Sequence, residues 1–168
     1  MGRWKPPPPA SSPYITAAGF DTLQVELKAL WVRRAEVVKA LAAAAAEGDR
    51  SENAEYIYRK KELGSLDYRI RYLQKRLPKL NIVPPISGDD ERHGQVFFGA
   101  RVTLRRTRNQ DDVEYKIVGP DETDAANDCI SIDSPLARAI LKKSVGDQAD
   151  LELEKGREHF TIKKIRYT

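Results

Sequence analysis

The sequence contains a single cysteine, Cys129, so an internal disulfide framework is excluded. It contains no run of about 18 apolar residues, so no segment is suited to span a bilayer as a helix. Its opening residues, MGRWKPPPPASSP, lack the apolar stretch of a secretory signal peptide. From these absences we expect a cytoplasmic protein that works in a reducing compartment and has no membrane partner.

Neither sign of charge dominates the composition, because 29 basic residues stand against 25 acidic ones and leave a formal net charge of +4. This small excess favours a polyanionic partner only weakly. Whether the chain has a basic binding surface depends on how the charges are distributed along it. Hydrophobic residues make up 40% of the 168 residues, which is enough for a core in one domain or in two small ones.

The first 14 residues are rich in proline and predict a flexible, extended leader. Between residues 15 and 83, apolar residues recur at steps of three and four, which is the pattern of a coiled coil. The first seam contains Phe20, Leu23, Leu27, Leu30, Val37 and Leu41, with Arg34 as a polar interruption. The second seam contains Leu63, Leu66, Ile70, Leu73, Leu77 and Leu80. The short connection between them predicts an antiparallel helical hairpin whose tip lies about 45 Å from its base.

The pattern changes after PPISGDDERHG, residues 84 to 94, which we interpret as a linker. The segments GQVFFGARVTL and VEYKIVG predict a β-hairpin, and CISI, ADLELE and HFTIKKIRY predict further strands. Between them, Ser134 and Pro135 are suited to the N-cap and first position of a short helix. Residues 95 to 168 therefore predict a small β-sheet domain with one helix, and the whole chain an α+β protein.

The second arm of the hairpin carries basic and aromatic residues on the face opposite its leucines. On a helical projection, one stripe contains Lys61, Tyr68, Tyr72, Lys75 and Lys79, with Arg69 and Arg76 beside it. Aromatic rings interleaved with cations are suited to single-stranded nucleic acid, because bases stack on the rings and cations neutralise phosphates. A solvated coiled-coil face that maintains solubility is the alternative interpretation.

The hairpin tip, EGDRSENAEY, allows two interpretations of its acidic residues. Asp49 and Glu52 have the spacing of a capping box, in which they would begin the second helix. Alternatively, the two carboxylates approach a divalent cation together. Two side chains supply too few ligands for octahedral magnesium, so such a tip would have to complete the site of another protein.

The tip sequence GDRSENAEY, followed by YRKKELGSLDYRIRYLQKRL, closely resembles the bacterial transcript cleavage factors of the Gre family, and the GreB branch above all. The later segments GQVFFGARVTL, YKIVG and ISIDSPLARAILKKSVGD resemble the carboxy-terminal domain of the same factors. The resemblance implies a coiled coil that enters the secondary channel of bacterial RNA polymerase and an FKBP-like head that binds the channel rim. It further implies that the factor is not itself a nuclease but stimulates the polymerase to hydrolyse backtracked RNA.

The same resemblance assigns roles to individual residues. Asp49 and Glu52 match the tip acids that retain a magnesium ion shared with the polymerase active site and orient the attacking water; the free protein is not expected to hold the ion tightly. Ser51, Asn53, Glu55 and Tyr56 are expected to shape or support the tip. The basic stripe is expected to bind the nascent RNA 3′ end, and the segment Asp133, Ser134 and Pro135 is expected to bind the polymerase. A monomer is expected.

Two other functions remain open at this point. The chain could occupy the polymerase channel and inhibit synthesis without RNA cleavage, as some Gre relatives do. It could also be a free-standing coiled coil that binds single-stranded RNA with strong salt dependence. The proline-rich leader and the charged segment RRTRNQDDV depart from the family pattern, but neither removes a tip acid.

Overall fold

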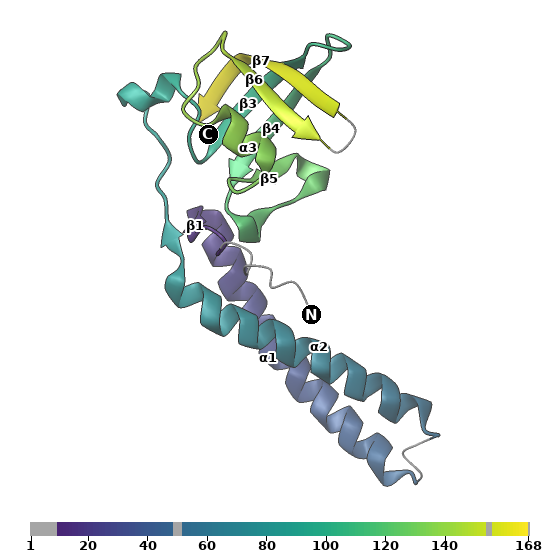
Figure 1. The fold of residues 1–168 in the computed structure, drawn as a ribbon. Coiled ribbons are helices and arrows are strands. Elements are labelled where there is room, and N and C mark those ends of the chain that lie inside the picture. Colours follow the sequence, from purple (N-terminus) through teal and green to yellow (C-terminus); the bar gives the residue numbers. More distant parts are fainter. Residues whose placement is uncertain (1–9, 49–51, 154–155, 168) are drawn as a thin grey trace, which may run out of the picture. The chain divides into compact units, whose positions relative to one another are not determined.

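The computed structural model describes residues 10–48, 52–153 and 156–167, and it divides the chain into two compact units (Figure 1). The helical unit contains Ala18–Leu80, and the second unit, called the head below, contains the residues up to Ala17 and from Asn81 onward. Among the helices of the described residues, none combines the length and the apolar character needed to cross a membrane.

Two long helices form the helical unit, as the sequence predicts. Helix α1 comprises Ala17–Ala46, α2 comprises Ala54–Arg76, and the 3-10 turn η1, Leu77–Lys79, continues α2. The helices lie side by side in opposite directions (Figure 1). Their seam buries Leu23, Val37 and Ala44 from α1 and Ile70 and Leu73 from α2. Beyond the end of α1, Gly48 has φ of +127°, a conformation that other residues rarely adopt.

Ion pairs connect the two helices beside the apolar seam. Arg34, the polar interruption of the first seam, bonds Asp67 on α2 with 2.6 Å between Nε and Oδ1. Closer to the base, Arg69 bonds Glu26 through Nε and Nη2 at 2.6 and 2.8 Å. Because such partly exposed pairs contribute only about 0.2–1 kcal/mol each, they select the register of the helices more than they stabilise the hairpin.

The head is built on a five-stranded sheet with the strand order β5-β4-β3-β7-β6. Its strands are β3 (Ala100–Arg106), β4 (Asp112–Val118), β5 (Cys129–Ser131), β6 (Gln148–Leu153) and β7 (Gly156–Tyr167). The predicted hairpin is the antiparallel pair β3 and β4, while β5 runs parallel to β4 at the edge. The α+β class and the strands predicted from the sequence are thus confirmed.

The core of the head lies between one face of this sheet and helix α3, Pro135–Ile140. Along β3, Val102 and Leu104 are fully buried, whereas the alternate residues point to the other face. Helix α3 contributes Ala137 and Ile140, both fully buried. Ser134 caps this helix as predicted, because its hydroxyl accepts a hydrogen bond from the backbone N–H of Ala137 at 3.2 Å.

A second, two-stranded sheet pairs β1 (Tyr14–Ile15) with β2 (Asn81–Ile82) in parallel. The predicted leader therefore differs from the structure at its end: Pro13 accepts a hydrogen bond from Asn81, and Tyr14 belongs to a strand. The physical reason is that Ile15, directly after the leader, is fully buried and Tyr14 pairs with Asn81 in the same sheet. Residues 1–9 lie outside the described residues.

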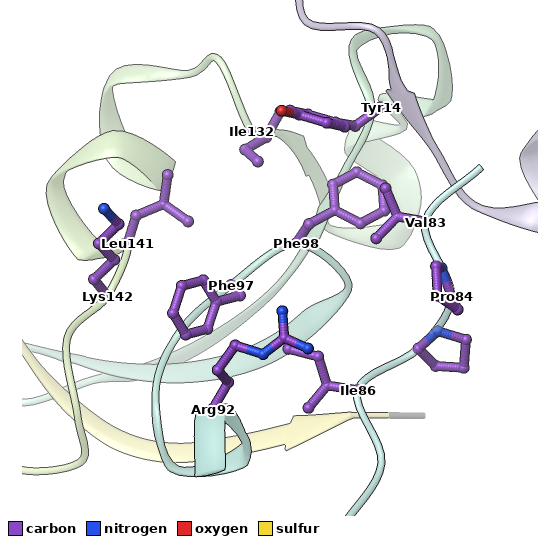
Figure 2. Close-up of a pocket in the computed structure, with 11 residues that line it drawn as sticks. Tyr14, Val83, Pro84, Ile86, Arg92, Phe97, Phe98, Ile132, Leu141 and Lys142 are labelled. Carbon is purple, nitrogen blue, oxygen red and sulfur yellow. The ribbon is translucent and has the colours of Figure 1, made fainter. Parts of the chain in front are cut away.

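Short 3-10 helices complete the head: η2 (Glu91–Gly94), η3 (Pro120–Glu122) and η4 (Ala125–Asn127). The predicted linker, residues 84 to 94, contains η2, which Asp90 caps by accepting from the N–H of Arg92 at 2.9 Å. The same segment forms one wall of an apolar cavity of about 460 Å³ in the head (Figure 2).

Candidate functional site

The structure locates the start of α2 and so separates the two interpretations of the tip. Asn53 is the N-cap, and its Oδ1 accepts a hydrogen bond from the backbone N–H of Tyr56 at 3.0 Å. Its Nδ2 also donates to the carbonyl of Ala44 on α1 at 2.9 Å. One side chain therefore caps α2 and connects it to the end of α1.

The capping box of Asp49 and Glu52 is therefore wrong as an account of the second helix. A helix capped at residue 49 would begin at residue 50 and contain Glu52, but α2 begins at Ala54. Asparagine caps a helix about as well as aspartate, and Asn53 also reaches α1. Glu52 is exposed before the cap. Asp49 and Ser51, the other predicted tip residues, lie outside the described residues.

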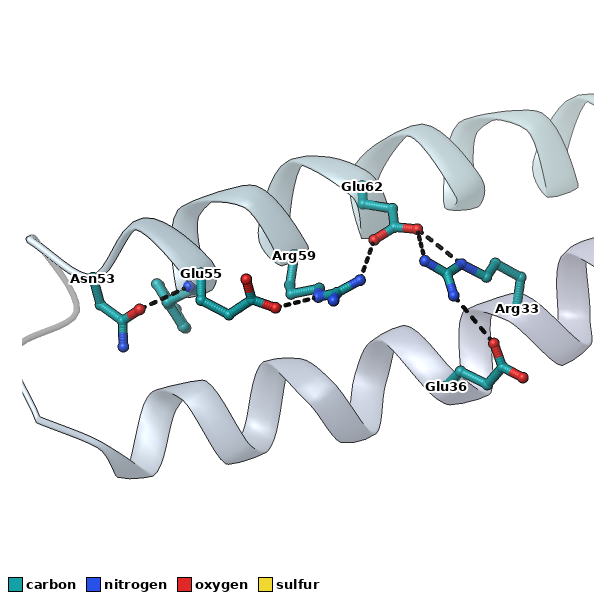
Figure 3. A network of polar contacts seen from close by, with 7 residues as sticks. Arg33, Glu36, Asn53, Glu55, Arg59 and Glu62 are labelled. Atoms are coloured by element: carbon teal, nitrogen blue, oxygen red, sulfur yellow. Dashed lines mark hydrogen bonds and ion pairs between the residues drawn. The ribbon is translucent and has the colours of Figure 1, made fainter.

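Glu55, predicted to support the tip, begins a chain of ion pairs along the hairpin (Figure 3). It accepts from Arg59 at 2.7 Å, and Arg59 in turn donates to Glu62 at 3.0 Å. Glu62 also accepts from Arg33 of α1 at 2.6 Å. The pKa of Glu62 is lowered, mainly by the hydrogen bond from Arg33 and in addition by the one from Arg59. The network neutralises Glu55 and ties the first turns of α2 to α1.

The next question is which metal-binding side chains the described part of the chain brings together. Within the described residues there is no group of three or more histidine, cysteine, aspartate or glutamate side chains that could hold a metal ion. Glu52 together with Asp49 offers two carboxylates, and carboxylate oxygen is a ligand that magnesium prefers. Two ligands are too few for octahedral magnesium, so an ion at these acids would need further oxygens from another molecule.

The basic stripe on α2 contains a shallow cleft of about 170 Å³. Tyr68, Tyr72 and Lys75 line it, as the sequence grouped them, together with Arg71, which the sequence analysis missed. Arg71 stands three residues after Tyr68 and four before Lys75, and this spacing could have revealed it. Tyr68 is 74% exposed, so its ring is accessible to a base.

The other predicted members of the stripe are placed differently. Lys61 and Lys79 are exposed, about two turns before the cleft and one turn after it. Arg69 is held by Glu26, and its guanidinium lies 5.3 Å from the ring centroid of Tyr72. Its charge is therefore balanced by Glu26 within the hairpin. Arg76 is half-buried at the end of α2.

The predicted polymerase-binding segment lies between β5 and α3. Pro135 is exposed at the first position of α3, while Ser134 is used as its cap. Asp133 accepts hydrogen bonds from both the backbone N–H and the hydroxyl of Ser12, at 2.8 and 2.5 Å. Its carboxylate is therefore bonded within the chain, a contact between residues far apart in sequence that the sequence analysis missed.

Comparison with known proteins decides the family. The family model described as transcription elongation factor, N-terminal, matches residues 13–82, and the one described as GreA/GreB, C-term, matches residues 91–167. The chain belongs to the GreA/GreB family of transcription elongation factors. It is 54% identical to transcription elongation factor GreB of Xanthomonas axonopodis pv. citri, over 99% of this chain and 98% of that protein.

Membership of the GreA/GreB family confirms the resemblance inferred from the tip and from the carboxy-terminal segments. GreB of Pseudomonas aeruginosa is 46% identical to this chain, over 99% of this chain and 98% of that protein. Both relatives carry the name GreB, in agreement with the predicted branch. Among solved structures, GreA factor homolog 1 of Thermus thermophilus matches 91% of this chain and 97% of its own with 25% identity and a TM-score of 0.41.

Proposed function

We propose that this GreA/GreB-family chain enters the secondary channel of bacterial RNA polymerase with its helical hairpin and stimulates the polymerase to cleave backtracked RNA. The observation that carries the proposal is the cap of α2: Asn53 begins the helix, so Glu52 is an exposed acid that the helix does not require. An exposed acid that does not cap the helix, in the connection at the end of a long hairpin, is suited to act in a partner's site.

In this proposal, Asp49 and Glu52 add carboxylate oxygens to a magnesium ion whose other ligands belong to the polymerase. Magnesium, when bound there, stabilises the attacking and leaving oxygens of the phosphodiester. Glu52 would orient a water by accepting a hydrogen bond from it, and Asn53 would connect the start of α2 to α1 by its contacts with Tyr56 and Ala44. The bond cleavage belongs to the polymerase, so the factor is an activator and not an enzyme.

The basic stripe supports a second part of the proposal, the contact with the extruded RNA 3′ end. Tyr68 offers an exposed ring, and Arg71 and Lys75 stand beside it in the same cleft. A base stacked on Tyr68 would leave its phosphate near these cations. The sequence tolerance of stacking suits a factor that meets RNA of any sequence.

The head is proposed to bind the polymerase at the segment from Asp133 to Pro135, of which Pro135 is exposed. The proposal places the factor in the cytoplasm as a monomer, where one hairpin serves one polymerase channel.

The test is the addition of the purified chain to backtracked polymerase complexes that carry end-labelled RNA. We expect RNA shortening with the wild type, strong loss of shortening with Glu52→Gln, and little loss with Glu47→Gln, an exposed acid at the other side of the tip. Inhibition of synthesis without shortening would support a channel-blocking regulator instead. RNA binding without any effect on the polymerase would support a free-standing RNA-binding protein.

A further inference from the structure

The five-stranded sheet of the head has a second face, opposite its core, that carries charged side chains. On the core side, Val102 and Leu104 of β3 and Ile117 of β4 are fully buried. Because successive residues of a strand point to opposite faces, the residues between them form another surface, called the open face below. The charged residues of the open face on β3, β4 and β7 are Arg101, Arg105, Asp112, Glu114, Lys116, Lys163, Lys164 and Arg166. Six of them are basic and two are acidic, so this face alone has a positive surplus as large as the formal net charge of +4 of the whole chain.

Strand pairing brings the basic residues of the open face together. Arg101 on β3 is paired with Lys116 on one side and with Arg166 on the other, so three cations form one row across the sheet. Like charges placed opposite one another are unfavourable unless something balances them. Glu114 bonds both arginines, with 3.2 Å between its Oε1 and Nη1 of Arg101. One carboxylate therefore serves two guanidinium groups, and the row keeps a positive surplus.

A β-bulge adds two consecutive lysines to the open face. The register between β3 and β7 shifts directly after Thr103, which is paired with Lys164. Lys163 is the extra residue at this shift, and both lysines are exposed. The pKa of Asp112 is lowered mainly by a hydrogen bond from Arg105, and the charge of Lys163 contributes, so Lys163 lies toward the open face. In a regular strand, two consecutive lysines would point to opposite faces, so the bulge concentrates their charge on one.

The lysines of the open face are available to a ligand. Within the described residues, Lys116, Lys163 and Lys164 form no ion pair, whereas Arg105 is held by Asp112 at 2.7 and 2.8 Å. The tyrosine and phenylalanine side chains of β3, β4 and β7 all pack against the core, namely Tyr115, Phe160 and Tyr167. The open face of these three strands therefore presents cations without phenyl or phenol rings, unlike the cleft on α2.

This combination of charge and chemistry indicates the ligand. We propose that the open face binds the phosphate backbone of duplex DNA without regard to its base sequence. Duplex DNA has one negative charge per about 1.7 Å of its axis, so cations fixed on a sheet can meet several phosphates at once. Lysine binds phosphate as a point charge, and phosphate contacts carry no sequence information. Single strands depend on stacking with aromatic rings, which the open face does not offer, so they suit the cleft on α2 instead.

The test measures the affinity of the full-length chain for a short, fluorescein-labelled DNA duplex of mixed sequence by fluorescence anisotropy, without polymerase. The double variant Lys163→Gln and Lys164→Gln, called the sheet variant, should weaken binding about three- to tenfold at low salt. Its plot of log affinity against log salt concentration should be shallower by about 2, because each lost phosphate contact removes about 0.9 from the slope. The matched control is Lys142→Gln with Lys143→Gln, which removes two adjacent lysines that follow α3 and lie outside the open face. It should bind nearly as well as the wild type.

A substitution of the opposite sign provides an independent measurement. Glu114→Gln removes the carboxylate that balances Arg101 and Arg166, so it should tighten binding of the duplex about two- to threefold at low salt. A face that serves only the stability of the sheet predicts no such gain. The melting temperature of Glu114→Gln shows whether the head remains folded.

The two basic surfaces of the chain are distinguished by their ligands. The sheet variant should bind single-stranded RNA like the wild type, whereas the substitution of Lys61, Lys75 and Lys79 by glutamine should weaken binding of RNA more than that of the duplex. If the sheet variant and its control lose duplex affinity equally at wild-type melting temperatures, total charge and not the open face determines binding, and the inference is wrong. A larger loss of RNA than of duplex affinity in the sheet variant would also overturn it. Because the assay contains no polymerase, either result leaves the proposed function standing.

Discussion

Ser12 donates its backbone N–H and its hydroxyl to the two carboxylate oxygens of Asp133, 121 residues later in the chain. Thr16 makes the same kind of contact with Glu122, which accepts from the backbone N–H at 3.0 Å and also from the hydroxyl. Gly119 allows the close approach, because a Cβ at this position would lie 2.1 Å from the carbonyl oxygen of Tyr14. Two carboxylates of the head thus hold the segment that leads into α1.

This relationship changes what a substitution at Asp133 is expected to do. Asp133→Ala removes the acceptor for two hydrogen bonds and should lower the free energy of unfolding by about 1–2 kcal/mol. The loss is moderate because the carboxylate is only partly buried, and solvent weakens hydrogen bonds to a charged group there. Thermal denaturation of Asp133→Ala, Ser12→Ala and the double variant measures the coupling. Additive losses of stability would contradict a direct contact and leave Asp133 as a polymerase-binding residue alone.

Measurements of polymerase binding should distinguish the role of Pro135 from that of Asp133. Pro135→Ala leaves the contact of Ser12 intact and should weaken polymerase binding with little loss of stability, because Pro135 is exposed. If Pro135→Ala binds polymerase like the wild type, the segment acts only as the start of α3.

The sequence was sufficient for the helices and most of the sheet, because each is defined by a local pattern. The leucine seams specify the hairpin, and the alternation around Val102 and Leu104 specifies a half-buried strand. The N-cap of α2 was not decidable, since Asp49 and Asn53 are equally good caps and only the contact of Asn53 with Ala44 favours one. The bonds of Ser12 and Arg69 could not be predicted, because their partners are set by packing between distant segments.

The pair Arg92 and Asp90 leads to a prediction on ionisation. Hydrogen bonds from the side chain and the backbone of Arg92 lower the pKa of Asp90 from 3.8 to about 2. Because the folded pKa is depressed, this pair stabilises the head above about pH 4, and the contribution is lost as the pH falls toward 2. Carbon-detected NMR titration should show the low pKa in the wild type and a pKa closer to 3.8 in Arg92→Gln. A titration of Asp90 that is unchanged by this substitution would contradict the pairing.

The cleft on α2 predicts a difference between two neighbouring arginines. Arg71→Gln should weaken binding of single-stranded RNA and slow the rescue of deeply backtracked complexes, because Arg71 lines the cleft with Tyr68 and Lys75. Arg69→Gln is the matched control and should affect RNA binding less, since Glu26 already balances its charge. The salt dependence of RNA binding should also become shallower for Arg71→Gln.

A second test of the stripe compares polymerase complexes with long and with short extruded RNA. The substitution of Lys61, Lys75 and Lys79 by glutamine should slow the rescue of deeply backtracked complexes more than that of shallow ones. Equal slowing of deeply and shallowly backtracked complexes would indicate that the stripe is a docking or solubility surface. The hypothesis that the stripe contacts RNA would then be wrong.

The tip allows the role of its acids in cleavage to be separated from the role of its cap in folding. Asn53→Ala removes the cap of α2 and the bond to Ala44, so it should destabilise the hairpin by about 1–2 kcal/mol. Asp49→Asn and Glu52→Gln should leave the thermal stability unchanged, because neither acid caps α2. Both should still bind polymerase but lose most of the stimulated cleavage, since a neutral amide is a weaker ligand for magnesium. The decisive measurement is the cleavage rate against magnesium concentration at saturating factor. High magnesium should restore part of the cleavage rate of both acid variants. In thermal denaturation, high magnesium should not restore the stability that Asn53→Ala loses. If Asp49→Asn and Glu52→Gln cleave like the wild type at low magnesium, the tip acids do not take part in the reaction, and the chain acts on the polymerase through docking alone.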